Sequence, residues 1–199
     1  MSQPWLECVP NFSEGRRPEV IAALRAVVAA EPGILVLDVH SDADHNRSVI
    51  TFAGPAESVA EAAFAAIRLA SQLIDLEQHR GEHPRIGATD VVPFVPLAGA
   101  RLEDCVEMAR ALGRRVGDEL EIPVFLYEAA ATRPDRVNLE NLRRGEYERL
   151  RQAIATDPER APDFGPARLG SAGAVVIGAR PPLIAFNINL ATDRLDVAK

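Results

Sequence analysis

The sequence lacks an excess of basic residues. Of its 199 residues, 22 are Lys or Arg and 29 are Asp or Glu, so the formal net charge at pH 7 is −7. A general nucleic-acid binder needs the opposite balance, because its side chains must neutralise phosphates. We therefore expect no nucleic-acid partner. A small anionic ligand would have to be bound by positive charge gathered at one place in the chain.

Cysteine is also scarce. Cys8 and Cys105 both lie in apolar segments and do not have metal-ligand spacing, so we expect buried free thiols and a reducing compartment. The first residues lack the basic start and apolar run of a signal peptide, and Glu and Arg interrupt the longest alanine-rich segments. We therefore expect no secretion signal, no membrane-spanning helix and, by default, a cytoplasmic location.

Loops that bind phosphate or calcium are missing as well. No Walker-type or Gly-x-Gly-x-x-Gly sequence occurs. Asp42 and Asp44 have a spacing found in calcium loops, but the glycine and the distal glutamate of an EF-hand are absent. The polar stretch at 40–47 is therefore first of all expected to form a turn.

What the sequence does contain is a regular alternation of helix and strand patterns. Apolar residues at helical spacing predict helices at 19–30, 56–76, 102–120 and 147–155, with a short helical turn at 139–142. Apolar or alternating runs predict strands at 6–12, 34–39, 48–53, 91–97, 123–127, 174–178 and 183–188. The near-continuous apolar run at 34–39 is typical of a buried strand.

This order predicts an α/β (α+β) fold, with a mixed β-sheet and helices packed on one face. Its first part, β-α-β-β-α-β, resembles a ferredoxin-like arrangement. Near the end of the sequence, Thr192 or Asp193 is a candidate helix cap. We interpret it as the start of another structural unit.

A polar loop at 78–90 carries the strongest candidates for chemistry. It holds two of the four histidines, and its glycines together with Pro84 exclude a regular helix. His79 and His83 are both candidates for acid–base work, because imidazole titrates near neutral pH. Pro84 stiffens the backbone beside His83 and makes it the better-held candidate. A metal site of His79, His83 and Asp90 is the alternative, although its spacing requires a helix.

Three further features could bind a ligand. Arg80 and Arg85 flank His83 and could hold a carboxylate, and Asp90 could orient an imidazole or an amine, or cap the next strand. The loop at 40–47 follows a strand, where ligands often bind in α/β sheets. Glycines at 163–173 would let the backbone approach a flat ligand, or simply make a flexible connection.

Several ordered motifs of this sequence resemble the glutamate formimidoyltransferase (glutamate formiminotransferase) family. The resemblance covers nearly the whole chain. It is carried by Glu-Cys-Val-Pro-Asn-Phe-Ser-Glu-Gly at 7–15, His-Asn-Arg-Ser-Val at 45–49, Gly-Glu-His-Pro-Arg-Ile-Gly-Ala at 81–88, Asp-Val at 90–91, Pro-Phe at 93–94, Arg-Gly-Glu-Tyr-Glu at 144–148, Ala-Pro-Asp-Phe-Gly-Pro at 161–166 and Leu-Ile-Ala-Phe-Asn-Ile-Asn-Leu at 183–190.

The resemblance implies that residues 1–180 form the N-terminal subdomain of this family and that 181–199 begin a truncated C-terminal subdomain. It implies transfer of the formimino group from N-formimidoyl-L-glutamate to tetrahydrofolate, which is a co-substrate, without a metal and in a homodimer. The alternative is a module that binds folate or an acidic metabolite without full activity, because the second subdomain is missing. The sequence leaves open whether the donor is formimino- or formyl-glutamate.

The resemblance also assigns residues. His83, in the Gly-Glu-His-Pro-Arg motif, is implied to be the acid–base catalyst, and the stretch from Gly165 to Gly173 is implied to bind folate. Together with the residues singled out above, the expected substrate and folate contacts are His40, Asn46, Arg47, His79, Arg80, Arg85, Gly87, Asp90, Gly165, Pro166, Ala167, Arg168, Leu169, Gly170, Ser171, Ala172 and Gly173.

Overall fold

The computed structural model describes residues 3–184, 190–192, 194 and 197. Within them, seven strands form one mixed sheet: β1 (Trp5–Cys8), β2 (Asn11–Phe12), β3 (Leu35–Asp42), β4 (Arg47–Pro55), β5 (Thr89–Pro96), β6 (Val124–Glu128) and β7 (Val175–Ala179). The α-helices are α1 (Pro18–Ala29), α2 (Ala56–Leu73), α3 (Leu102–Leu120), α4 (Leu139–Arg143) and α5 (Glu146–Ala153), and two 3₁₀ turns are at Pro134–Arg136 and Pro158–Arg160.

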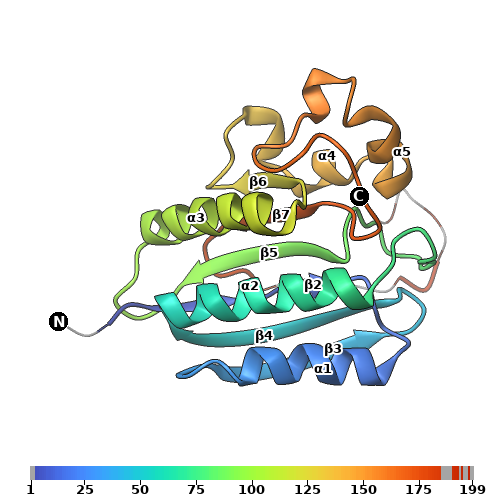
Figure 1. Ribbon diagram of the computed structural model, residues 1–199. Coiled ribbons are helices and arrows are strands. Elements are labelled where there is room, and N and C mark those ends of the chain that lie inside the picture. Colours follow the sequence, from blue (N-terminus) through green and yellow to red (C-terminus); the bar gives the residue numbers. More distant parts are fainter. Residues whose placement is uncertain (1–2, 185–189, 193, 195–196, 198–199) are drawn as a thin grey trace.

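The strand order confirms the ferredoxin-like arrangement. β1 and β2 follow one another as an interrupted strand, which pairs antiparallel with β4 on one side and with β5 on the other. β3 pairs antiparallel with β4 at one edge, so the first β-α-β-β-α-β unit has the order β3, β4, β1/β2, β5. β7 then lies parallel between β5 and β6 and extends the sheet (Figure 1).

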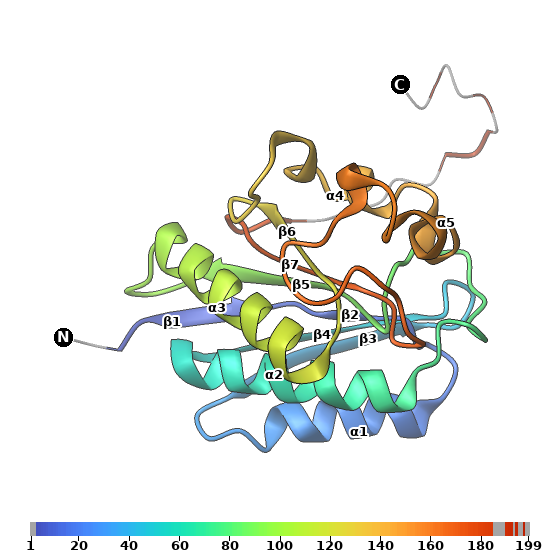
Figure 2. The same ribbon diagram turned by 45° about the horizontal axis from the view of Figure 1, so that its top comes forward.

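The three long helices cover one face of the sheet, as the sequence predicts (Figures 1 and 2). Their apolar sides pack on the strand residues that point to that face, such as Phe52, Phe94 and Ile177, and form the main core. The short helices α4 and α5 pack on the opposite face, against Phe125 and Val176 of β6 and β7. Because they cover only that end, the opposite face near β3 and β4 has no helix over it among the described residues.

The strand predicted as buried at 34–39 is wrong in that respect. β3 is the edge strand, and the side chains of Leu35 and Leu37 are 55% and 56% exposed. A run of apolar residues does not reveal whether a sheet continues beyond it. β3 also extends to Asp42, so His40 belongs to the strand and the turn is confined to 43–46.

Other boundaries differ by a few residues. The predicted first strand is divided at Val9 and Pro10, and α2 ends at Leu73 instead of residue 76. In the strand predicted at 183–188, Leu183 and Ile184 have no strand structure and the remaining positions lie outside the described residues. Of the two candidate caps near the end, Asp193 also lies outside them.

Cys8 and Cys105 are both buried and free, as predicted, and the reducing compartment stays a prediction. In the part of the chain that the structure describes, no helix is both long and apolar enough to cross a membrane.

Candidate active site

The structure joins two polar loops that are about 35 residues apart in the sequence. The loop at 78–88 lies against the turn between β3 and β4, where the amide of Asn46 donates to Arg80 O at 3.0 Å. Gly81 makes this approach possible, because a Cβ atom at that position would lie 2.4 Å from the carbonyl oxygen of His45. The close packing places His83 beside the residues of the turn.

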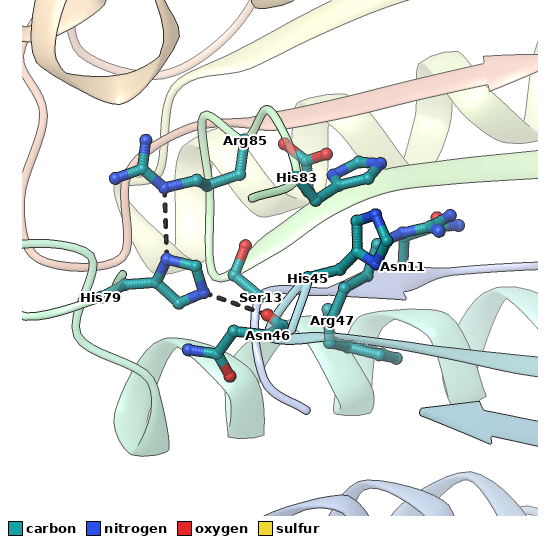
Figure 3. Close-up of a pocket in the computed structure, with 10 residues that line it drawn as sticks. Asn11, Ser13, His45, Asn46, Arg47, His79, His83 and Arg85 are labelled. Carbon is teal, nitrogen blue, oxygen red and sulfur yellow. Dashed lines mark hydrogen bonds between the residues drawn. The ribbon is translucent and has the colours of Figure 1, made fainter. Parts of the chain in front are cut away.

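His83 lines a pocket at the end of β2 and β4 (Figure 3). The rings of His83 and His45 face one another edge to face, with centroids 6.3 Å apart. The other residues that line the pocket come from four segments of the chain, and they are Asn11, Phe12, Ser13, Asn46, Arg47, His79, Arg85 and Asp90.

Burial and nearby positive charge set the protonation of His83. Burial, then the guanidinium groups of Arg47 and Arg143, lower the pKa of His83 to about 4, against the opposing effect of Asp90. At neutral pH its imidazole is therefore uncharged and able to accept a proton. This is the protonation state that a general base needs.

His79 is held in a different way. It is 7% exposed, its Nε2 lies 3.0 Å from Asn46 O, and its Nδ1 lies 3.2 Å from the Nε of Arg85. Arginine Nε can only donate, so Nδ1 is the acceptor and Nε2–H donates to the carbonyl oxygen. Burial lowers the pKa of His79, which keeps it neutral in this tautomer. With both nitrogens engaged, His79 supports the loop.

The alternative metal site of His79, His83 and Asp90 is wrong, because His79 and Asp90 both use their polar atoms for contacts within the protein. Asp90 is 2% exposed, with one carboxylate oxygen accepting from Ile86 N at 2.8 Å and the other from Arg143. Asp90 thus orients the backbone of the loop and an arginine, and no imidazole. Among the described residues, no group of three or more His, Cys, Asp or Glu could hold a metal ion.

Arg80 and Arg85 do not form the carboxylate grip that the sequence suggested. Arg85 is nearly buried and gives its N–H groups to His79, Glu146 and Glu148, in four hydrogen bonds. Arg80 is exposed and donates to the carbonyl oxygen of His79 at 2.6 Å, in a hollow that His83 does not line. These contacts assign both arginines to the support of the loop.

Arg143 is a residue of the site that sequence reasoning missed. It ends α4, its guanidinium binds Asp90, and it lines a second hollow that His83 also lines. The rest of that hollow is formed by Pro84, Glu140, Arg144, Gly145 and Glu146. The available signal was its position immediately before the Arg-Gly-Glu-Tyr-Glu motif. His45 was also missed as a pocket residue, and its Nδ1 lies 3.1 Å from Asp42 Oδ2.

His40 and the stretch 165–173 lie outside these two hollows. His40 is exposed on β3. Gly173 forms a β-bridge with Gly87, and Ala88 N donates to Ala172 O at 2.8 Å, so the stretch lies directly beside the residues that follow His83. Gly87 allows this contact, since a Cβ atom there would lie 1.8 Å from a backbone carbonyl oxygen. Arg168 is exposed and pairs with Glu121 at 2.8 Å.

Comparison with known proteins places these residues in a family. The model described as "Formiminotransferase domain, N-terminal subdomain" matches residues 5–180. The chain is 50% identical to the glutamate formimidoyltransferase of Thermoplasma acidophilum over 98% of its length and 47% identical to that of Streptococcus pyogenes over 97%. It is 52% identical to the formimidoyltransferase-cyclodeaminase of Sus scrofa over 95% of its length. The chain spans 64% of the first two relatives and 35% of the third.

Proposed function

The chain belongs to the formiminotransferase family, of which it has the N-terminal subdomain, and from this we propose that it serves formimino transfer from N-formimidoyl-L-glutamate to tetrahydrofolate. In this proposal His83 is the acid–base catalyst, tetrahydrofolate is the co-substrate and L-glutamate is released. The names of the relatives support the class of reaction, and the motifs quoted above support the residue.

The observation that carries the proposal is the state of His83. It is the histidine of the Gly-Glu-His-Pro-Arg motif that carries the resemblance to the family, it lines both hollows, and its pKa of about 4 keeps it unprotonated at neutral pH. His79, the other candidate, has both ring nitrogens bound within the protein. The two histidines of the loop are therefore not equivalent, and this difference supports His83 as the acid–base residue.

The reaction requires two proton transfers. The N5 amine of tetrahydrofolate attacks the amidine carbon of the donor, and a C–N bond forms as the carbon becomes tetrahedral. His83 accepts the proton that the attacking nitrogen must lose. It then returns a proton to the nitrogen of glutamate, whose C–N bond breaks. General acid–base catalysis of this kind contributes about 10²–10⁴-fold to the rate.

Folate would be bound with the help of the stretch 165–173. This stretch is anchored through the bridge between Gly87 and Gly173, so a ligand on it would lie close to the loop that carries His83. The arrangement supports the proposal because the N5 amine of tetrahydrofolate must come within reach of His83. The contacts of the individual residues from Pro166 to Ala172 are part of this proposal.

The test is transfer activity with His83 replaced by Gln. We expect the variant to keep the circular-dichroism spectrum and the urea midpoint of the unchanged chain and to lose about 10²-fold or more of its kcat. The matched control is Gln78→Ala, an exposed position in the same loop. Normal turnover by a folded His83→Gln variant would overturn the catalytic assignment. If the unchanged chain binds tetrahydrofolate in calorimetry without turnover, the alternative of a binding module applies instead.

A further inference from the structure

Arg47 and Arg143 both lie near His83. Arg47 lines the pocket at the end of β2 and β4, Arg143 lines the second hollow, and His83 lines both. Each guanidinium lowers the pKa of His83, and burial together with the charge of Arg143 lowers the pKa of Arg47. The shared place of His83 in both hollows thus brings two cations near the proposed base.

Both arginines have few acceptors. A guanidinium has five N–H donors. Among the described residues, Arg47 uses one of them on Asn11 and Arg143 uses one on Asp90. The Nε atom of each is buried and without a partner in that part of the chain. By contrast, Arg85 makes four hydrogen bonds to its neighbours. The donors at His83 are thus largely unused by the protein.

The charges around His83 do not balance. Arg47 comes from β4, Arg143 from α4 and Asp90 from β5, and the neighbouring turn adds His45 with its partner Asp42, whose side chain is 40% exposed. The second hollow also has Glu140 and Arg144, which are exposed, and Glu146, which is paired with Arg85. Asp90 is thus the one buried carboxylate that the described residues set against the partly buried cations of Arg47 and Arg143. Burying an unmatched charge is costly, and an anion bound here would relieve that cost.

We propose that Arg47 and Arg143 form a carboxylate-binding subsite beside His83, and that it takes one carboxylate of a dicarboxylic amino-acid derivative. Guanidinium groups match carboxylate oxygens in paired hydrogen bonds, and two of them converge on this place. The inference rests on the proposed function, in which the donor carries two carboxylates and its amidine carbon must reach His83. It gives Arg47 and Arg143 the role that the sequence suggested for Arg80 and Arg85.

The experiment is calorimetric titration of the purified chain with L-glutamate, glutarate and inorganic phosphate. We expect both dicarboxylates to bind more tightly than phosphate. Arg143→Gln should weaken their binding about tenfold or more, and Arg143→Lys should restore part of it, since lysine keeps the charge but not the paired geometry. The matched control is Arg110→Gln, which removes the same charge from an exposed position on α3.

Arg143→Gln leaves the buried Asp90 without its partner, so that variant could lose stability for a structural reason. The double variant Arg143→Gln with Asp90→Asn removes both charges and is compared by the same titration. A second readout is the NMR titration of His83. Replacing Arg143 should raise the pKa of His83, and glutarate should raise it in the unchanged chain but much less in the variant.

Three results would overturn the inference. They are the absence of binding of either dicarboxylate to the unchanged chain at millimolar concentration, a folded Arg143 variant that binds them as tightly as the unchanged chain, and binding of phosphate that is equal or tighter. Because the titrations involve no group transfer, they can succeed when transfer fails and fail when transfer succeeds. The subsite and the proposed reaction are therefore tested separately.

Discussion

Replacing Arg85 by Ala is the sharpest test of the structural role that we assign to this arginine. The side chain of Arg85 is 8% exposed. Its guanidinium binds His79, in the loop that carries His83, and also Glu146 and Glu148 of α5, so it connects the loop to that helix. If these contacts hold the loop, the substitution acts on stability first. If Arg85 binds substrate, it acts on the Michaelis constant and leaves stability unchanged.

The expected magnitude follows from the exposure of the partners. Glu146 and Glu148 are 41% and 57% exposed, so solvent screens both ion pairs and each contributes only about 0.5–1 kcal/mol. The larger loss is at His79, whose buried Nδ1 is left without a donor at a cost of about 1–3 kcal/mol. Arg85→Ala should therefore lower the free energy of unfolding by roughly 2–4 kcal/mol.

The assay is urea unfolding followed by circular dichroism, with the m-value compared between variants. Glu148→Ala alone should cost at most about 1 kcal/mol, and the double variant should reveal a coupling of about 0.5–1 kcal/mol. Arg80→Ala, at an exposed neighbouring position, is the matched control and should stay within about 0.5 kcal/mol. A stable Arg85→Ala protein with a raised Michaelis constant for the donor would refute the structural role.

Three further predictions concern stability. Gly87→Ala should lower the free energy of unfolding by about 3 kcal/mol or more, because a carbonyl oxygen would lie 1.8 Å from the new Cβ. Its control is Gly170→Ala, where the new Cβ would have nothing within 4 Å. In the same urea assay that variant should change the free energy of unfolding by at most about 0.5 kcal/mol. Asp163→Asn should cost about 3–5 kcal/mol in thermal or urea unfolding, because it leaves the buried cation of Arg136 unpaired. A loss below about 1 kcal/mol, the size expected for a surface ion pair, would contradict this. The pKa of His83 is about 4 in the folded chain and about 6.5 when unfolded, so the unfolded state takes up the proton first and stability should fall as the pH decreases from about 6.5 to 4. His83→Gln should flatten that dependence, and an identical slope in both proteins would count against the lowered pKa.

The sequence predicts the long-period features of the fold well. The helix at 102–120 is found with the same bounds, and the ferredoxin-like order follows from elements whose patterns are long and regular. The sequence does not predict the exposure of a strand, because this depends on which other elements pack beside it. The apolar run at 34–39 has the same pattern in a central strand and in an edge strand, and only the folded structure shows that β3 is at the edge and that Leu35 and Leu37 are exposed.

For the candidate site, too, local features could be predicted from the sequence and long-range contacts could not. Local sequence identified the loop, and the family motif singled out His83 within it. The roles of its neighbours could not be read locally, because the glutamates that engage Arg85 lie 61 and 63 positions further along the chain. Arg143 lies in a stretch that appeared rich in loops, and its approach to Asp90 joins positions 53 residues apart.

The place of β7 in the sheet sets the order in which the chain can fold. β5 and β6 are made first, yet neither pairs with the other, because β7 fills the space between them. Until residues 175–179 arrive, both strands have an open edge, which exposes an intermediate to association through its strands. The same late segment carries Ala174, whose N–H holds Ile86 of the loop with His83. A ribosome-bound chain would therefore acquire its proposed catalytic geometry only after almost all of the described residues have been synthesised, and we expect slow folding dominated by these long-range pairings.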